Sequence, residues 1–97
     1  MVKHVVIWKV KDPARRDAHI VTVKNALEGL RGRIPGLLAI EVGADLGFDK
    51  SGQDVALYSE FADRAALDVY QDHPLHQDAK AIIGPLLTNR VAIDWLV

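Results

Sequence analysis

The chain has 97 residues, of which 49% are hydrophobic and 26% are charged, as expected for one globular domain and not for a disordered chain. Its 12 Lys and Arg residues nearly balance its 13 Asp and Glu residues, for a formal net charge of −1, so neither a nucleic-acid-binding nor a polybasic membrane-binding face is expected. Cysteine is absent, which excludes disulfide bonds, thiolate metal sites, iron–sulfur clusters and cysteine nucleophiles.

Residues 2–10 predict the first β-strand, because they are rich in β-branched and aromatic types. Alternation along this strand places His4 on the same face as Val6 and Trp8. No small-residue cleavage site follows the short apolar stretch, as a secretory signal would need, and no apolar run approaches the roughly 18 residues of a membrane span. We therefore expect a cytoplasmic protein that makes no membrane contact.

A first helix is expected over residues 13–33. Asp12 can accept hydrogen bonds from the free amides at its start, and Pro13 fits the first helical position. Gly32 and the Pro-Gly pair at residues 35–36 should end it. Apolar residues recur along the segment at steps of three and four, as on one face of a helix: Ile20, Val23, Leu27, Leu30 and Ile34.

Two strands joined by a loop follow the first helix. Residues 37–42 resume strand character, and residues 54–61 alternate between two faces as a strand does. Between them, residues 48–53 contain the turn-forming run Asp-Lys-Ser-Gly, which predicts a hairpin loop.

The second half of the chain predicts a broken helix and a last strand. Helical character begins at Asp63 and stops at His73, because a residue that precedes a proline is forced out of the helical region. Pro74 fits the start of a new helix, which should end near Gly84 because the next residue is again a proline. The last strand is expected over residues 89–97.

The resulting β-α-β-β-α-β order predicts a ferredoxin-like α+β fold in a single domain over residues 1–97. In this fold an antiparallel four-stranded sheet carries both helical segments on one face. The other face of the sheet then has to meet either solvent or a partner.

Neither face of the predicted sheet has a polar character. In the first strand, Val5 and Ile7 lie opposite Val6 and Trp8, whereas a sheet with one solvated face shows a cleaner alternation. A symmetric homodimer with sheet face against sheet face would bury the open side. The alternative is a monomer whose exposed apolar residues are simply those that any protein surface carries.

Three polar side chains are expected to meet in an apolar pocket between the sheet and the helices. His76 lies in the first turn after Pro74, where the positive end of the helix dipole disfavours the imidazolium ion and keeps the ring able to accept a proton. Tyr70 faces inward from the preceding helix, and His4 faces inward from the first strand. Such a pocket is typical of a small-ligand site, although His76 can equally be a structural histidine bonded to a carbonyl group.

Other candidate sites receive less support from the sequence. His73 and His76 stand three residues apart, as metal ligands can, but His73 should lie outside the helix that holds His76, and no third imidazole has ligand spacing. We therefore expect no metal. Ser51 and Ser59 have no evident His and Asp partners for a hydrolase triad, and His19 is expected on the surface.

The opening strand at residues 2–6, the Pro35 that closes the first helix, and a Tyr-x-x-His-Pro-x-His motif at residues 70–76 resemble the stress-responsive α/β-barrel (Dabb) domain family. The resemblance spans nearly the whole chain and implies a dimeric α+β barrel without an organic cofactor. It also implies four ligand-binding residues: His4, Tyr70, His73 and His76.

The family's polyketide cyclases of the olivetolic acid type supply possible catalytic roles. By that resemblance His76 would act as the base and Tyr70 would orient the substrate carbonyl in an aldol-type ring closure. Three functions stay open: a protein that binds a small hydrophobic or aromatic ligand, a cofactor-independent enzyme that is cyclase-like or monooxygenase-like, and a purely structural dimer.

Overall fold

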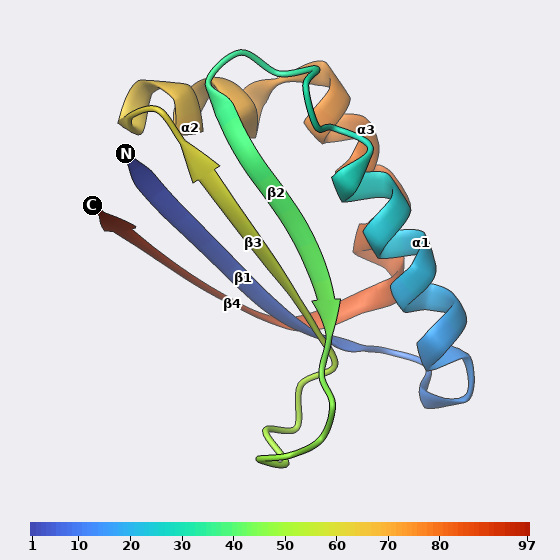
Figure 1. Cartoon of the computed structure of the whole chain (residues 1–97). Helices are drawn as coiled ribbons and strands as arrows, with labels where there is room; N and C mark the ends of the chain where they lie inside the picture. Colours follow the sequence, from blue (N-terminus) through green and yellow to red (C-terminus); the bar gives the residue numbers. More distant parts are fainter.

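Strands and helices follow one another in the predicted β-α-β-β-α-β order (Figure 1), in a computed structural model that describes all 97 residues. The elements are β1 (Val2–Val10), a 3-10 turn (Pro13–Arg15), α1 (Arg16–Glu28), β2 (Leu37–Ala44), β3 (Val55–Phe61), α2 (Arg64–Asp72), α3 (Pro74–Ile83), a second 3-10 turn (Gly84–Leu86) and β4 (Leu87–Leu96).

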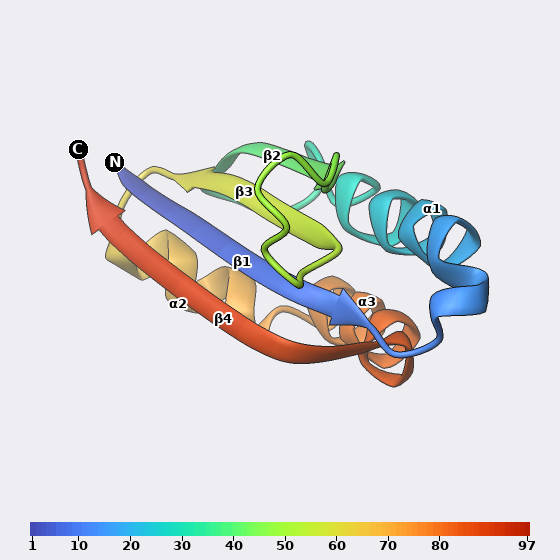
Figure 2. The same ribbon diagram turned by 90° about the horizontal axis from the view of Figure 1, so that it is seen from below.

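The four strands form one sheet in the order β2-β3-β1-β4, and every neighbouring pair is antiparallel. The helices lie on one face of this sheet and leave the other face bare (Figures 1 and 2). The two termini lie side by side (Figure 2), and the backbone N–H of Val97 donates to the carbonyl of Met1 at 2.9 Å. The ferredoxin-like α+β prediction is confirmed.

The first helix is shorter than the predicted range of 13–33. It begins at Arg16, after a 3-10 turn that Asp12 caps through the amide of Ala14, and it ends at Glu28. Beyond it the chain continues in turns, and Gly32 adopts a positive φ of 74°, a conformation that an α-helix does not contain. Leu30 and Ile34, two residues of the predicted apolar stripe, are nevertheless buried in the core.

The break between α2 and α3 occurs at the predicted residue. Asp63 caps α2 by accepting a hydrogen bond from the amide of Ala66 at 2.8 Å. His73 is extended, with φ −64° and ψ 136°, because Pro74 follows it and opens α3. This corner turns the chain so that side chains from both helices reach the same space over the sheet.

The core lies between the helices and the inner face of the sheet, where 19 hydrophobic residues are buried. Residues of β1 alternate between this inner face and the bare outer face. The β4 strand differs, because all its residues after Leu87 are partly or fully exposed. Its outer face carries three exposed apolar side chains, with Val91 49%, Ile93 60% and Trp95 44% exposed.

Side chains of α1 and the following turn close the free edge of β2. The carboxylate of Glu28 accepts the N–H of Val42 at 2.9 Å, while Lys24 donates to the carbonyl of Val42 at 3.0 Å and to Glu28 at 2.7 Å. Arg31 donates to the carbonyl of Ile40 at 2.6 Å. These bonds satisfy backbone groups that an edge strand otherwise offers to another chain.

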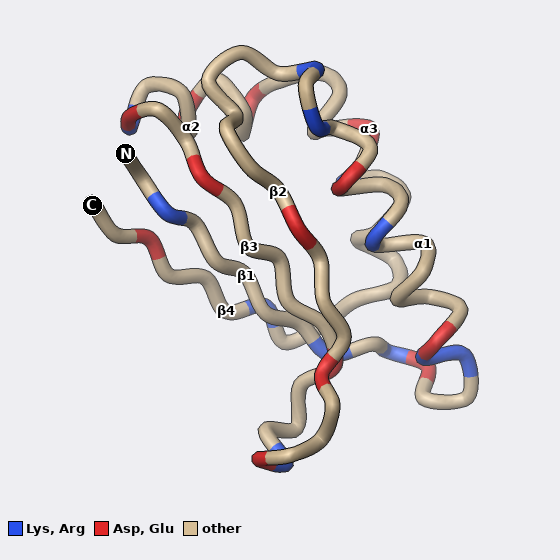
Figure 3. Tube along the Cα trace, viewed as in Figure 1, with Lys and Arg blue, Asp and Glu red and all other residues tan.

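Basic and acidic residues are interspersed along the trace (Figure 3), and their numbers nearly balance. None of the helices has the length and apolar character that crossing a bilayer requires.

Candidate ligand-binding site

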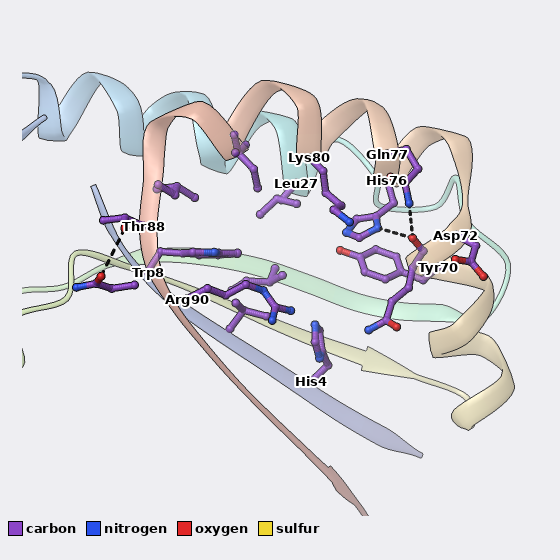
Figure 4. Close-up of a pocket in the computed structure, with 17 residues that line it drawn as sticks. His4, Trp8, Leu27, Tyr70, Asp72, His76, Gln77, Lys80, Thr88 and Arg90 are labelled. Atoms are coloured by element: carbon purple, nitrogen blue, oxygen red, sulfur yellow. Dashed lines mark hydrogen bonds between the residues drawn. The ribbon is translucent and has the colours of Figure 1, made fainter. Parts of the chain in front are cut away.

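A cavity of about 750 Å³ lies between α3, the end of α2 and the inner face of β1 and β4 (Figure 4). Its volume falls in the range of small-molecule sites. The lining combines a group of apolar residues with polar residues around them. It is formed by His4, Val6, Trp8, Leu27, Leu57, Tyr70, Gln71, Asp72, His76, Gln77, Lys80, Ile83, Gly84, Leu87, Thr88, Asn89 and Arg90.

Tyr70 projects from α2 into this space, with its hydroxyl group directed toward the cavity (Figure 4). The residue is only 1% exposed, and its ring packs at 4.9 Å between centroids against Phe61. The buried hydroxyl has no hydrogen-bond partner. Burial raises the pKa of Tyr70 to about 12, so the phenol is a neutral donor at physiological pH.

His76 stacks on Tyr70 from the first turns of α3, with the ring centroids 4.1 Å apart and the planes at 31°. Its Nδ1 lies 3.2 Å from the backbone carbonyl of Gln71. Because a carbonyl oxygen can only accept, Nδ1–H is the donor and Nε2, on the cavity side of the ring (Figure 4), is left free to accept a proton. Burial lowers the pKa of His76, against the opposing effect of the Gln71 carbonyl, and keeps the ring neutral.

His4 lies deeper in the sheet, only 3% exposed, and its Nδ1 bonds to a carboxylate oxygen of Asp94. The two residues face each other across the β1–β4 ladder. The carboxylate accepts a hydrogen bond from Nδ1–H and fixes the orientation of the ring, in the way that carboxylates orient catalytic and metal-bound histidines. The pairing of Asp94 with His4 follows from the strand register, which the sequence does not give.

The structure brings His4, Tyr70 and His76 to one cavity but places His73 elsewhere. The Nδ1 atom of His73 accepts the N–H of Leu75 at 3.1 Å and thereby caps α3. His73 does not line the cavity. No group of three or more His, Cys, Asp or Glu side chains is arranged to hold a metal ion.

Two cationic lining residues, Lys80 and Arg90, were not among the candidates from the sequence. Lys80 follows His76 by four residues and so shares its side of α3. Arg90 comes from β4 next to a register irregularity, where Asn89 has a φ of 55°. Arg90 alternates with the outward-facing Val91 and so shares the inner face of β4 with Asp94, but which face of β4 meets the helices follows only from its register with β1.

Comparison with solved structures supports the fold. A dimeric ferredoxin-like protein of unknown function from Thermobifida fusca YX is 33% identical, covers 99% of this chain and 90% of that chain, and has a TM-score of 0.86. A dimeric protein of unknown function and ferredoxin-like fold from Bacteroides fragilis NCTC 9343 is 30% identical over 97% of this chain and 93% of that chain, also with a TM-score of 0.86. A hydroxynitrile lyase from Passiflora edulis, at 20% identity over 99% of this chain and 92% of that chain, shares the fold with a TM-score of 0.75.

A search among curated proteins finds no match to the sequence. The model of the stress responsive A/B barrel domain, Dabb, matches residues 2–97. With this match over nearly its whole length, and with two solved relatives of at least 30% identity, the chain belongs to the Dabb family of stress-responsive A/B barrel domains.

Proposed function

We propose that this protein is a homodimer that binds a small hydrophobic or aromatic molecule in the cavity beside Tyr70 and His76. One observation carries the proposal: a neutral, buried phenol hydroxyl without a partner points into a space with an apolar wall. A buried donor left unpaired costs about 1–3 kcal/mol. A ligand that brings one acceptor oxygen to this position would remove that cost.

The walls of the cavity favour an apolar body on this ligand. Trp8 offers a ring face on the sheet side, while Leu27 and Ile83 lie on the helix side. Burying apolar surface against such side chains contributes about 25 cal/mol per Å². Polar groups of the lining, Tyr70 and His76 among them, would then orient the molecule.

The bare sheet face supports the homodimer. Val91, Ile93 and Trp95 of β4 lie on it, next to the half-buried Val5 and Ile7 of β1 with which two of them pair. A continuous apolar patch of this kind marks an interface, and the relatives from Thermobifida fusca and Bacteroides fragilis are both described as dimeric. We place the interface on this outer face, with two sheets packed against each other around a twofold axis.

The binding proposal is tested by two aromatic probes of one shape, 2-acetylnaphthalene and 2-ethylnaphthalene, of which only the ketone has an acceptor oxygen. In Tyr70→Phe the ketone should bind about 5- to 10-fold more weakly, as for the loss of one hydrogen bond worth about 1 kcal/mol. The affinity for the hydrocarbon should not change. Tyr58→Phe is the control, because Tyr58 bonds to Glu60 and does not line the cavity. Equal affinities of wild type and Tyr70→Phe for the ketone would refute the assigned role of the phenol.

A second function, proton abstraction by His76, is favoured by the stacked pair of a neutral imidazole and a neutral phenol. In this reaction Nε2 of His76 would take a proton from a carbon between two carbonyls, and the Tyr70 hydroxyl would donate to the enolate oxygen that forms. A cyclase-like ring closure begins with this step.

Deuterium exchange measures that step without knowledge of the substrate. We expect the protein to accelerate exchange of the central C–H of an aryl 1,3-diketone in D₂O. His76→Ala should reduce the acceleration at least about 100-fold and still bind the diketone. The control is His19→Ala, outside the cavity, which should accelerate exchange as much as wild type does. If wild type and His76→Ala exchange at the same rate, the protein is a binding protein and not this kind of enzyme.

A further inference from the structure

We propose that the ligand is an anion, an aromatic or aliphatic carboxylate whose charged group is bound between Lys80 and Arg90. This inference rests on the proposed function, because it assigns a chemical class to the molecule that the cavity takes. It depends on the two cationic side chains of the lining and on the absence of a protein partner for either of them.

The two cations belong to opposite walls of the cavity. Lys80 comes from α3 and Arg90 from β4, and both line the cavity together with His76 (Figure 4). An anion that enters between the helix and the strand therefore meets positive charge from both sides. Arg presents a planar fork of N–H donors that matches a carboxylate, and Lys adds a mobile point charge.

Neither Lys80 nor Arg90 has a carboxylate partner. By contrast, Arg16 pairs with Asp54 at 2.9 Å and Lys24 pairs with Glu28 at 2.7 Å, so these two cations are engaged within the fold. The side chains of Lys80 and Arg90 take part in no ion pair and no hydrogen bond. Their charges are therefore available to a ligand.

The carboxylates near the cavity do not neutralise these cations. Asp94 is bonded to His4, and Asp72 lies at the α2–α3 corner, on the far side of Tyr70 from Arg90 (Figure 4). The positive potential also reaches His76: after burial, which lowers its pKa most, the charges of Lys80 and Arg90 lower it further. A cavity with low-dielectric walls strengthens such a field relative to open solvent.

Together these groups specify the ligand. Its carboxylate would lie between Lys80 and Arg90, its apolar body against Trp8 and Leu27, and a second oxygen within reach of the Tyr70 hydroxyl. A neutral hydrocarbon would leave both cations without a counter-ion. A cationic ligand would be repelled.

Calorimetry with 2-naphthoate and 2-naphthamide tests the assignment, because the two probes differ mainly in charge. We expect wild type to bind the carboxylate about 10-fold more tightly than the amide at low salt, with the preference falling as sodium chloride screens the charges. Lys80→Met and Arg90→Met should each reduce the preference, and the double variant should abolish it. Lys11→Met and Arg33→Met, exposed positions outside the cavity, are the matched controls and should retain it.

The outcomes separate the two proposals. Equal binding of both probes by wild type, or a carboxylate preference that survives in the double variant, would overturn the anion assignment and leave the binding function standing. If neither naphthyl probe binds or perturbs the ring signals of Tyr70 and His76, both proposals fail. The far-ultraviolet circular dichroism of each variant establishes that it is folded. A reversed preference, for 2-naphthylmethylamine, in Lys80→Glu combined with Arg90→Glu would give independent support.

Discussion

At the scale of single residues, the site depends on polar groups that the fold keeps neutral in an apolar setting. Burial raises the pKa of Tyr70 and lowers that of His76, so both stay uncharged at neutral pH, one as donor and the other as acceptor. The pair differs from Arg16 and Asp54, whose charges are matched and whose role is to tie α1 to the end of β1 and the start of β3. The pKa shifts of Tyr70 and His76 favour the neutral form of each group, whereas those of Arg16 and Asp54 favour the charged form.

The depressed pKa of His76 predicts its titration. Its ring should gain a proton only below the 6.5 of an unperturbed histidine, because burial penalises the imidazolium ion. The unfolded chain binds this proton at higher pH than the native one does, so the free energy of unfolding should fall as the pH drops below about 6.5. Histidine ring NMR signals measured between pH 4.5 and 8 give the midpoint. A midpoint for His76 at or above 6.5 would contradict the account.

The unpaired hydroxyl of Tyr70 predicts an opposition between stability and binding. Tyr70→Phe removes a buried donor that has no partner, so the unliganded protein should be as stable as wild type or up to about 1 kcal/mol more stable. Urea unfolding measures this difference, and the same variant should bind ketone probes more weakly. Destabilisation by more than about 1 kcal/mol would show that the hydroxyl already has a structural role.

At the scale of elements, one proline decides the geometry of the site. Pro74 ends α2 at the preceding residues and opens α3, so Tyr70 at the end of one helix meets His76 at the start of the next. This corner could be predicted from the sequence, and with it the inward positions of both side chains. The His4–Asp94 pair and the presence of Arg90 in the cavity could not, because they depend on the β1–β4 register, which decides the face of β4 that meets the helices.

The capping role of His73 predicts the effect of substituting it. His73→Ala should destabilise the protein by about 1 kcal/mol, because the N–H of Leu75 loses its acceptor. His73→Asn, which keeps a cap acceptor, should lose much less. Since His73 does not line the cavity, probe affinity in calorimetry should be nearly unchanged in both variants. A loss of affinity without a loss of stability would instead make His73 a ligand-binding residue.

The closed edge of β2 predicts an acid-sensitive contact. The hydrogen bond from Lys24, and next that from the Val42 amide, lower the pKa of Glu28, so its stabilising contribution is present above the unfolded value near 4.5 and is lost as pH falls below it. Glu28→Gln should therefore reduce the stability measured by urea unfolding at pH 7 and flatten its dependence on pH between about 5 and 3. If the stability of this variant depended on pH as that of wild type does, Glu28 would not stabilise the edge of β2.

At the scale of the whole molecule, the sheet has one face covered by helices and one face for a partner. The lack of polar alternation in β1 made the second apolar face predictable from sequence. How much of the inner face of β4 the helices cover was not predictable, because it depends on how α2 and α3 pack. That uncovered part of β4 is where Asp94 and Arg90 lie.

A charge on the outer face should therefore separate the subunits. Ile93→Lys places an ammonium group in the proposed interface, and sedimentation equilibrium should then give the monomer mass of 10.7 kDa, with wild type at about twice that value. Val21→Lys is the control, because Val21 is 56% exposed on α1, away from the sheet. A monomeric wild type at micromolar concentration would contradict the proposed interface directly.

The most direct test of the account is a crystal structure of the protein with 2-acetylnaphthalene. We predict that the naphthyl ring lies in the cavity between Trp8 and Leu27 and that its carbonyl oxygen is within about 3.2 Å of the Tyr70 hydroxyl. Binding of the probe at another place, or a cavity filled by rearranged side chains with the Tyr70 hydroxyl bonded to the protein itself, would contradict the central claim.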